Sequence, residues 1–450
     1  MELLRWLTDA LWRPWLLGLF LVTGLVYSIG SGFFQITRFP LWWRATLGSL
    51  LRPVKGCKGG GLSSLQALAT ALASTMGTGS IAGVAAAVTL GGPGAVFWMW
   101  ISAFLGMMTG CGEKLLSVRY QRPVPGGGLE GGPMFYLRDG VGSPLLAGWF
   151  ALACLPATLA GGDLIQSSSI AASLEAAFGA DRLAVGAAVT LLTALVMLGG
   201  LGRIARVSWV LVPAMALLYL GSGAAVLIVR ADRLPQALGL IFSCALSPSA
   251  ALGGGAGWTV AQGMRYGVAR GVFTNEAGLG TSAMAHGAAR ADHPARQGMW
   301  GIFEVFLSTL VVCTVTALVI LVAGPWQPGV PGALTGAPLT AAAFGTVLGR
   351  AGEGMVALSL LLFAFSSILG WSYYGEQALR FLAGGSRFLS AYRTVFLAGT
   401  LAGALWEGEF LWLLVDLSSA LMALPNLAAL LILAPQALGL LREWAGPRRI

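Results

Sequence analysis

Residues 74–83 read STMGTGSIAG and lie in the middle of an apolar run at residues 64–90, SLQALATALASTMGTGSIAGVAAAVTL. A membrane-spanning helix needs roughly 20 apolar residues, so this run is long enough to cross a bilayer. Yet glycine costs about 1 kcal/mol relative to alanine inside a helix, and a backbone group without a partner is expensive in hydrocarbon. The stretch therefore predicts a helix that is interrupted halfway across the membrane, and something must offset the cost of the interruption.

The composition indicates that the whole chain is an all-α integral membrane protein. Of 450 residues, 56% are hydrophobic and 10% are charged, with a mean hydropathy of +0.79, whereas soluble domains carry roughly 25% charged residues. Apolar runs recur from near residue 15 to near residue 437, which predicts one transmembrane domain over residues 1–450. The net charge of +9 comes from bases in short loops, which fits membrane topology and not nucleic acid binding.

Hydropathy identifies ten candidate spans, and the charges of their loops predict the topology. The spans lie near 14–36, 64–90, 93–118, 145–173, 183–202, 209–229, 299–323, 354–380, 393–406 and 411–437. The loop after the first span is basic, the next loop, LGGPG, carries no charge, and the loop after residue 118 is basic again. Because basic loops stay in the cytoplasm, we expect the N-terminus outside and the C-terminus in the cytoplasm.

The same alternation requires an eleventh crossing between residues 258 and 290. The chain leaves residue 229 outside, yet Arg290 and Arg296 precede a span whose far loop carries no charge. The intervening stretch is too polar for hydropathy to rank it highly, and it contains FTNEAGLGTS at residues 273–282. The seventh of eleven spans is therefore predicted to be interrupted, like the second.

Two interrupted spans that lie five apart predict an inverted repeat. Spans two to six and seven to eleven run in opposite directions because five is odd, and the first span stands outside the repeat. Amides at the start of a half-helix suit a carboxylate, and freed carbonyls suit a small cation. A small-residue packing surface is the alternative for either stretch alone. The expected parts are a first helix and connector (1–60), a first five-helix repeat (61–230), a surface helix with the second repeat (231–437) and a cytoplasmic tail (438–450).

Five stretches resemble the alanine or glycine:cation symporter family of the amino acid-polyamine-organocation superfamily. They are TALASTMGTGSIAGVAAAVTLGGPGAVFWMW at 70–100, GGPMFYL at 131–137, RGVFTNEAGLGTSAMAHGAARADHPARQG at 270–298, FAFSSILGWSYYGE at 363–376 and ALMALPNL at 420–427. The resemblance implies a leucine-transporter-like fold of five plus five helices after one extra helix. It also implies sodium-driven import of alanine or glycine across a bacterial inner membrane, with sodium as the coupling ion and no other cofactor. It indicates no oligomeric state.

The resemblance also implies roles for individual residues. A sodium site is expected at the carbonyls of Ala73 and Met76 and the hydroxyls of Ser366 and Ser367. Phe273 and Trp371 are expected to close over a small side chain. The expected substrate-binding residues are Thr78, Gly79, Ser80, Gln166, Phe273, Thr274, Asn275 and Trp371.

Three positions depart from the family pattern. Ser80 stands where the family usually has asparagine, as do Asp163 and Ser168. Asp163 and Gln166 are three apart, so we expect them on one face of a helix. Because a carboxyl group inside a bilayer is a functional hypothesis by default, the alternative function is proton-coupled transport of a different small amino acid through Asp163.

Other ionisable residues are expected to be structural or solvated. Glu113 is placed near the cytoplasmic mouth beside Lys114, and His286 and His293 are placed at a wet cytoplasmic edge. An enzyme is disfavoured because the chain lacks a nucleophile elbow and a P-loop. A channel is disfavoured because two interrupted helices suit alternating access.

Overall fold

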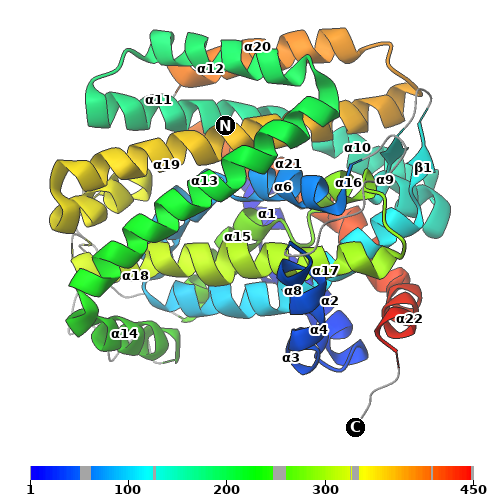
Figure 1. Ribbon diagram of the computed structural model, residues 1–450, viewed down its shortest axis with the longest axis horizontal. Helices are drawn as coiled ribbons and strands as arrows, with labels where there is room; N and C mark the ends of the chain where they lie inside the picture. The colour runs from blue at the N-terminus through cyan, green and yellow to red at the C-terminus, as the bar shows by residue number, and fades with distance from the viewer. Residues whose placement is uncertain are drawn as a thin grey trace.

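The computed structural model describes residues 2–50, 62–124, 128–246, 260–324, 326, 334–406 and 409–446. The predicted boundary between residues 60 and 61 lies outside these ranges. Within them the chain is helical except for loops and one antiparallel pair of two-residue strands, β1 (Arg122–Pro123) and β2 (Leu129–Glu130). Most of the long helices run side by side in Figure 1.

The helices have the following bounds. In chain order they are α1 (Glu2–Leu11), α2 (Pro14–Gly30), α3 (Phe34–Thr37), α4 (Phe39–Ala45), α5 (Leu47–Leu50), α6 (Ser64–Thr75), α7 (Ala82–Gly91), α8 (Gly94–Arg119), α9 (Pro133–Phe135), α10 (Pro144–Leu159), α11 (Ile165–Phe178), α12 (Arg182–Met197), α13 (Gly200–Val229), α14 (Leu234–Leu246), α15 (Val260–Asn275), α16 (Thr281–Gly287), α17 (Pro294–Val305), α18 (Thr314–Ala323), α19 (Gly336–Ala383), α20 (Leu389–Leu405), α21 (Glu409–Ile432) and α22 (Ala434–Ala445). Short 3-10 turns lie at η1 (Thr78–Ser80) and η4 (Ala231–Arg233), and π-helical turns at η2 (Tyr136–Gly140), η3 (Ala160–Leu164) and η5 (Phe306–Cys313).

A helix lies at each of the ten spans that hydropathy indicates. Within the described residues, seven helical runs are long and apolar enough to cross a membrane, and three shorter apolar helices, α7, α12 and α20, accompany them. The sixth span differs from the prediction, because α13 begins at Gly200 and not near residue 209. The guanidinium of Arg203 turns back and donates to the carbonyl of Leu195 at 2.6 Å, so this base sits within the helix and not in a loop before it.

The packing of the long helices is reciprocal between the two halves of the chain. Span four (α10) packs on span eleven (α21), while span six (α13) packs on span nine (α19). Spans three and eight, α8 and α17, pack on each other, as do spans five and ten, α12 and α20. Exchanging spans that lie five apart turns the contact of spans four and eleven into that of spans nine and six, and leaves the other two contacts unchanged. An inverted repeat predicts this pattern.

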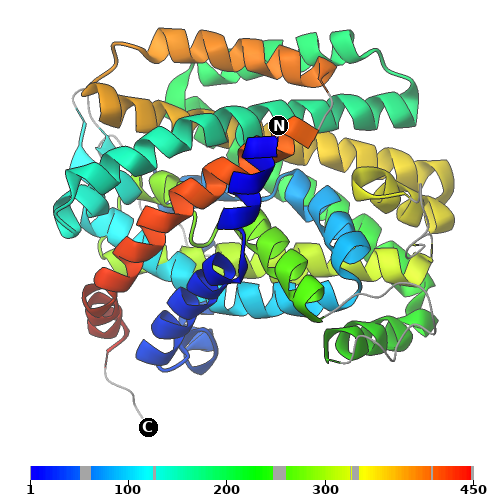
Figure 2. The ribbon, with the colours of Figure 1, turned by 180° about the vertical axis from the view of Figure 1, so that it is seen from behind.

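The first helices stand outside this reciprocal pattern. Figure 2 shows α1 and α2 beside α21. The indole nitrogen of Trp12 donates to the carbonyl of Asp416 at 2.8 Å, and the Tyr27 hydroxyl donates to that of Leu430 at 2.9 Å. The first span is therefore fixed to the last.

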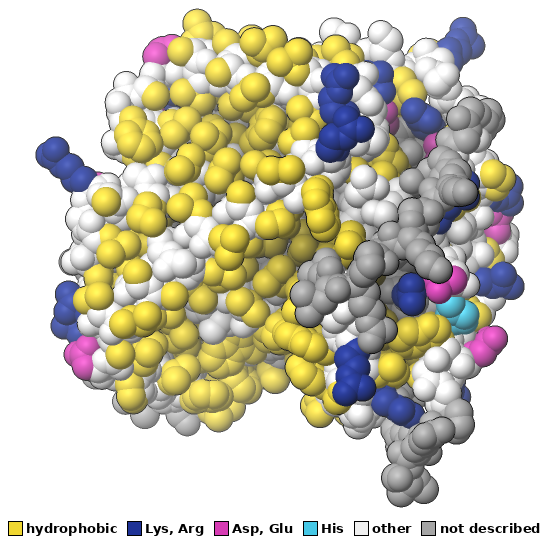
Figure 3. All heavy atoms as spheres, viewed as in Figure 1, with side chains coloured by type: hydrophobic (Ala, Val, Ile, Leu, Met, Phe, Trp, Pro, Cys, Tyr) yellow, Lys and Arg dark blue, Asp and Glu magenta, His cyan; other side chains and the backbone are white. Residues whose placement is uncertain are grey.

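The outer surface is apolar over its middle. Hydrophobic side chains cover much of the face in Figure 3, and most Lys and Arg side chains gather toward its right side, where the C-terminus lies in Figure 1. Leu191, Leu217 and Ile228 are among the large apolar side chains that are more than half exposed. Such a surface is expected to face lipid, since soluble monomers rarely expose large contiguous apolar patches.

Candidate functional site

The first interruption lies between α6 and α7, and it is completely buried. Met76 leaves the helical conformation (φ −84°, ψ 58°), Gly77 is extended, and one 3-10 turn leads to Ile81. A Cβ atom at Gly77 would lie 2.5 Å from the Ser367 hydroxyl oxygen. Glycine is needed at residue 77 because the backbone approaches α19 so closely.

The second interruption separates α15 from α16 and consists of residues 276–280. Glu276, Gly278 and Gly280 all have positive φ angles, of 54°, 95° and 81°. Two of the three are glycine, which accepts this conformation without steric cost. The Glu276 carboxylate accepts a hydrogen bond from the Thr281 hydroxyl, which ties the end of α15 to the start of α16.

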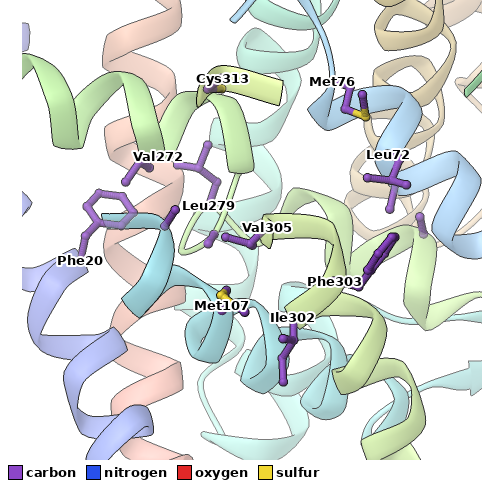
Figure 4. Close-up of a cluster of buried hydrophobic side chains, with 14 of the residues drawn as sticks. Phe20, Leu72, Met76, Met107, Val272, Leu279, Ile302, Phe303, Val305 and Cys313 are labelled. Atoms are coloured by element: carbon purple, nitrogen blue, oxygen red, sulfur yellow. The ribbon is translucent and has the colours of Figure 1, made fainter. Parts of the chain in front are cut away.

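The two interruptions lie against each other at the centre of the protein. A Cβ atom at Gly79 would meet the Phe273 ring at 3.1 Å and the Thr274 hydroxyl oxygen at 3.2 Å. Figure 4 shows Phe20, Val272 and Leu279 grouped around the second interruption, with Val305 nearby. Both predicted interruptions are therefore present, and they meet within one core.

A small cavity of about 10 Å³ opens between the interruptions. Its lining comes from both interrupted helices and from η3, α11, α19 and α21. The lining residues are Ser74, Thr75, Gly77, Gly79, Gly161, Gln166, Phe273, Glu276, Leu279, Trp371 and Ser419. The cavity is polar at the first interruption and aromatic at Phe273 and Trp371.

Four of the expected substrate-binding residues line this cavity, namely Gly79, Gln166, Phe273 and Trp371. The other four lie beside it. Thr274 donates its hydroxyl to the carbonyl of Arg270 at 2.7 Å, and Asn275 accepts from the amide of Ala277 at 3.0 Å. The hydroxyls of Thr78 and Ser80 are buried without a hydrogen-bond partner among the described residues.

Gln166 connects α11 to the first interruption. Its side-chain oxygen accepts from the Thr78 amide at 3.3 Å, and its nitrogen donates to the Gly161 carbonyl at 3.0 Å. The side chain thus occupies one amide of the first interruption. A ligand that binds this amide must displace or share Gln166.

The expectation that Asp163 and Gln166 share a helix face is wrong. Asp163 points toward α20, where its Oδ1 accepts from the Thr400 hydroxyl at 2.7 Å, whereas Gln166 lines the cavity. The cause is the π-helical turn η3, whose wider spacing rotates residues 160–164 relative to an α-helix. Ser168 also lies away from the cavity and donates to the carbonyl of Trp406 at 2.9 Å.

Three of the four residues expected at a sodium site lie together. The Ser366 hydroxyl oxygen is 2.8 Å from the Ala73 carbonyl oxygen, and the Ser367 hydroxyl oxygen is 3.2 Å from the same atom and 3.0 Å from the Ser74 carbonyl. The backbone of Met76 departs from the helix one turn later. These neutral oxygens are the ligand type that a hard cation prefers.

A second, larger cavity of about 130 Å³ adjoins the first and shares Phe273, Leu279 and Ser419 with it. It is also lined by α1 and by charged side chains at the outer ends of α15 and α21. The charged residues are Asp9, Arg265, Arg270 and Asp416. This cavity is a candidate entrance to the smaller one, and Phe273 lies at the boundary between them.

Several lining residues were not predicted. Ser74, Thr75 and Gly77 lie in the stretch that predicts the interruption, so the sequence signal was present, but it does not say which atoms face inward. Gly161, Leu279 and Ser419 come from three different elements. A cavity lined from so many elements can be assembled only once their packing is known.

The comparisons with known proteins agree with this arrangement. The model of the sodium:alanine symporter family matches residues 1–449. The chain belongs to this family. Its members are transporters, and the chain is therefore a multi-pass membrane transporter and not an enzyme.

Two relatives cover nearly the full length of the chain. An uncharacterized transporter of Haemophilus influenzae is 42% identical over 94% of this chain and 91% of its own. The sodium/alanine symporter AgcS of Methanococcus maripaludis is 38% identical over 96% of this chain and 94% of its own. Each match covers more than nine tenths of this chain and of the relative, so it is not confined to the interrupted helices.

A solved structure shares the fold at low identity. The manganese transporter of Eremococcus coleocola, crystallised with an aromatic bis-isothiourea compound, superposes with a TM-score of 0.53 at 14% identity, over 88% of this chain and 82% of its own. This likeness concerns the fold alone.

Proposed function

We propose that the protein is a secondary symporter that imports alanine or glycine together with sodium by alternating access. The observation that carries this proposal is the meeting of two buried helix interruptions at one small cavity, beside a cluster of neutral oxygens at Ala73, Ser366 and Ser367. Unwound backbone at membrane depth is tolerated where it lines such a cavity.

We further propose the five-plus-five inverted repeat after one extra helix, with the N-terminus outside and the C-terminus in the cytoplasm of a bacterial cell. The reciprocal packing of the long helices supports the repeat. The gathering of basic side chains on the side of the C-terminus supports the orientation.

The substrate's carboxylate is assigned to the backbone around Gly79, at the start of the half-helix α7. Amides at a helix N-terminus hold an anion without an arginine. The substrate's side chain then points to Phe273 and Trp371, whose rings limit its size. This arrangement favours a small neutral amino acid.

Sodium is assigned to the oxygens of Ala73, Met76, Ser366 and Ser367. In the structure the two serine hydroxyls are close enough to donate to the Ala73 carbonyl. A cation that binds there takes over this carbonyl, and each serine turns a lone pair toward the ion. Ion binding thereby fixes the first interruption in the form that accepts the amino acid.

Proton coupling is a second candidate, and one observation favours it. Asp163 is fully buried, and its Oδ2 atom has no hydrogen-bond partner among the described residues. A carboxylate in this position is costly unless it binds a proton. Asp163 is not among the residues that line the cavity, which argues against a direct contact with substrate.

Uptake into liposomes distinguishes these proposals. The purified protein should accumulate labelled alanine or glycine under an inward sodium gradient and should only equilibrate it without one. Accumulation under a proton gradient in the complete absence of sodium would mean that protons, through Asp163, and not sodium drive transport. Failure of every gradient to drive accumulation would contradict symport.

A further inference from the structure

A cluster of ionisable side chains is fully buried behind the second interruption, away from the cavity. Glu113 and Lys114 come from α8, Glu304 from α17 and His286 from α16, and all four side chains have no exposed area. The Lys114 amino group lies 3.5 Å from Glu113 and 3.4 Å from Glu304. The expectation that His286 lies at a wet edge is therefore wrong, because the convergence of α8, α16 and α17 encloses it.

The cluster is bonded directly to the second interruption. Glu113 Oε1 accepts from the Gly278 amide at 2.9 Å and from the Asn426 side-chain nitrogen at 2.8 Å. The same Asn426 nitrogen lies 2.9 Å from the Gly278 carbonyl oxygen, and the Asn426 oxygen accepts from the Tyr136 hydroxyl. A movement of the second interruption must change these contacts.

The position of the ring hydrogens of His286 follows from the orientation of the Gln297 side chain. Its Nδ1 atom lies 2.6 Å from the side-chain oxygen of Gln297, and the Gln297 nitrogen donates to the Ser64 hydroxyl at 2.8 Å. Because an amide oxygen only accepts, Nδ1 carries a hydrogen. In a neutral ring the other nitrogen, Nε2, then has a lone pair.

That lone pair faces a carboxylate. His286 Nε2 lies 3.4 Å from Glu304 Oε2, which also lies 3.4 Å from the Lys114 amino group, and among the described residues Nε2 has no hydrogen-bond partner. Two acceptors facing each other in a dry interior are unfavourable. One additional proton, on the imidazole or on the carboxyl group, turns the contact into a hydrogen bond.

The surroundings of the pair are rich in acidic side chains. Glu113, Glu304 and nearby Glu276 supply three acids, whereas Lys114 supplies one base, and all are buried. Unpaired charge in a low-dielectric interior costs several kcal/mol per ion. The other titratable groups that bear on the cluster are Cys111 of α8, Tyr374 of α19, and Tyr27 and Tyr136 on the Glu113 side. None of these four carries positive charge, so they do not replace the proton.

We propose that His286 and Glu304 form a proton-binding site that controls the second interrupted helix. The pair holds one proton while α16 packs against α8 and α17, as in this structure. When α16 moves away, the pair separates and the proton passes to water. This inference rests on the proposed transport function only for the movement of α16, and the bound proton itself can be tested without transport.

Nitrogen NMR of isotope-labelled histidine tests the bound proton. The chain contains two histidines, so His293→Gln leaves His286 as the single signal. We expect Nδ1 of His286 to be protonated at neutral pH, with Nε2 either protonated or accepting a strong hydrogen bond. A ring protonated only at Nε2, with Nδ1 bare, would mean that Gln297 is reversed and Glu304 is an ordinary acceptor, and it would overturn the proposal.

Transport measurements test whether the His286–Glu304 pair controls the position of α16. The alanine concentration for half-maximal uptake should rise when the pH is made alkaline on both sides of the membrane. One linked proton limits this rise to about tenfold per pH unit. His286→Gln should flatten this dependence. His293→Gln is the matched control and should keep it, since His293 only caps α17 by accepting from the Ala295 amide at 3.1 Å.

The outcomes separate this proposal from the function on which it rests. An identical pH dependence in the wild type and in both His286→Gln and Glu304→Gln would overturn proton control. If the wild-type protein moves no alanine or glycine, the proposed function fails, while the NMR signal of His286 still decides whether the pair holds a proton. If His286→Gln does not fold, Glu304→Gln provides the same comparison.

Discussion

The two interrupted helices look alike in sequence but are satisfied in different ways. At the second interruption, side chains form hydrogen bonds with backbone groups. Glu113 accepts from the Gly278 amide, Asn426 donates to the Gly278 carbonyl, and Asn275 accepts from the Ala277 amide. At the first interruption, Gln166 accepts from the Thr78 amide, and the hydroxyls of Thr316 and Thr340 donate to the carbonyls of Ser80 and Ile81. The hydroxyls of Thr78 and Ser80 themselves lack a partner among the described residues.

This difference suggests that the two interruptions have different functions. Buried polar groups are nearly always paired, so the first interruption is built to be completed by a ligand. At the second, protein side chains bind the backbone of Ala277 and Gly278, and the bonds of Gly278 lead to a buried charge cluster. We infer that the first interruption binds the substrate. The second holds its half of the protein in position until the protonation of that cluster changes.

The largest effect is expected from removing the base of the buried cluster. Lys114→Met leaves Glu113 and Glu304 without their counter-charge, and breaking a buried pair costs about 3–5 kcal/mol. The midpoint of thermal unfolding in detergent should fall strongly, and the yield of folded protein with it. Arg122→Met is the control, because its pair with Asp139 is partly exposed and is worth about 1 kcal/mol at most. Equal midpoints for the two variants would show that the second interruption does not depend on the cluster.

A methyl group at the first interruption should abolish tight binding while sparing the fold. In Gly77→Ala the new Cβ atom falls 2.5 Å from the Ser367 hydroxyl, so this hydroxyl must turn away from the Ala73 carbonyl or the interruption and α19 must separate. We expect alanine affinity to fall about tenfold or more, equivalent to about 1.4 kcal/mol, as measured by calorimetry.

The matched control is Gly83→Ala in the same broken helix. No atom of the described residues lies within 4 Å of a Cβ atom at Gly83, and alanine is favoured over glycine in a helix by about 1 kcal/mol. Gly83→Ala should bind alanine normally. If the two variants bind equally well, the close approach of Gly77 to α19 has no role in binding.

A smaller effect, on the sodium dependence of uptake alone, is expected from substitutions in α19. Ser366→Ala combined with Ser367→Ala removes two oxygens near the Ala73 carbonyl, and the sodium concentration for half-maximal uptake should rise several-fold, toward about tenfold. Ser372→Ala in the same helix removes a hydroxyl that bonds only to Leu369, at 2.8 Å, and should leave sodium dependence unchanged. An unaltered sodium dependence in the double variant would remove both serines from the ion site.

The smallest effect is expected at Asp163. Asp163→Asn keeps an oxygen that accepts from Thr400 and changes no residue of the cavity lining. Sodium-driven uptake should stay within about twofold of the wild type, equivalent to about 0.4 kcal/mol, since the substitution keeps the size of the side chain and its bond from Thr400. Loss of uptake in this variant would instead favour proton coupling through Asp163.

Much of the fold could be predicted because the signals are local. Glycines and hydroxyl residues inside an apolar run predict both interruptions, and alternation of loop charge places the polar seventh span where hydropathy alone does not. The face of Asp163 could not be predicted, because a π-helical turn leaves no clear mark in the sequence GGDLIQ at residues 161–166.

The buried cluster could not be predicted for a different reason. His286 and Glu304 are 18 residues apart in sequence, and Glu113 lies in the other half of the chain. Their burial depends on how α8, α16 and α17 converge, and this is a property of packing that no local pattern contains. The same holds for Leu279 and Ser419 at the cavity.

The most direct test of the division between the two interruptions is a density map of the protein with alanine and sodium bound. We expect the carboxylate of alanine against the backbone at Gly77 and Gly79, its methyl group toward Phe273 and Trp371, and the contacts of Gly278 with Glu113 and Asn426 still in place. Alanine bound to the backbone of residues 277–279, with the first interruption empty, would contradict the account.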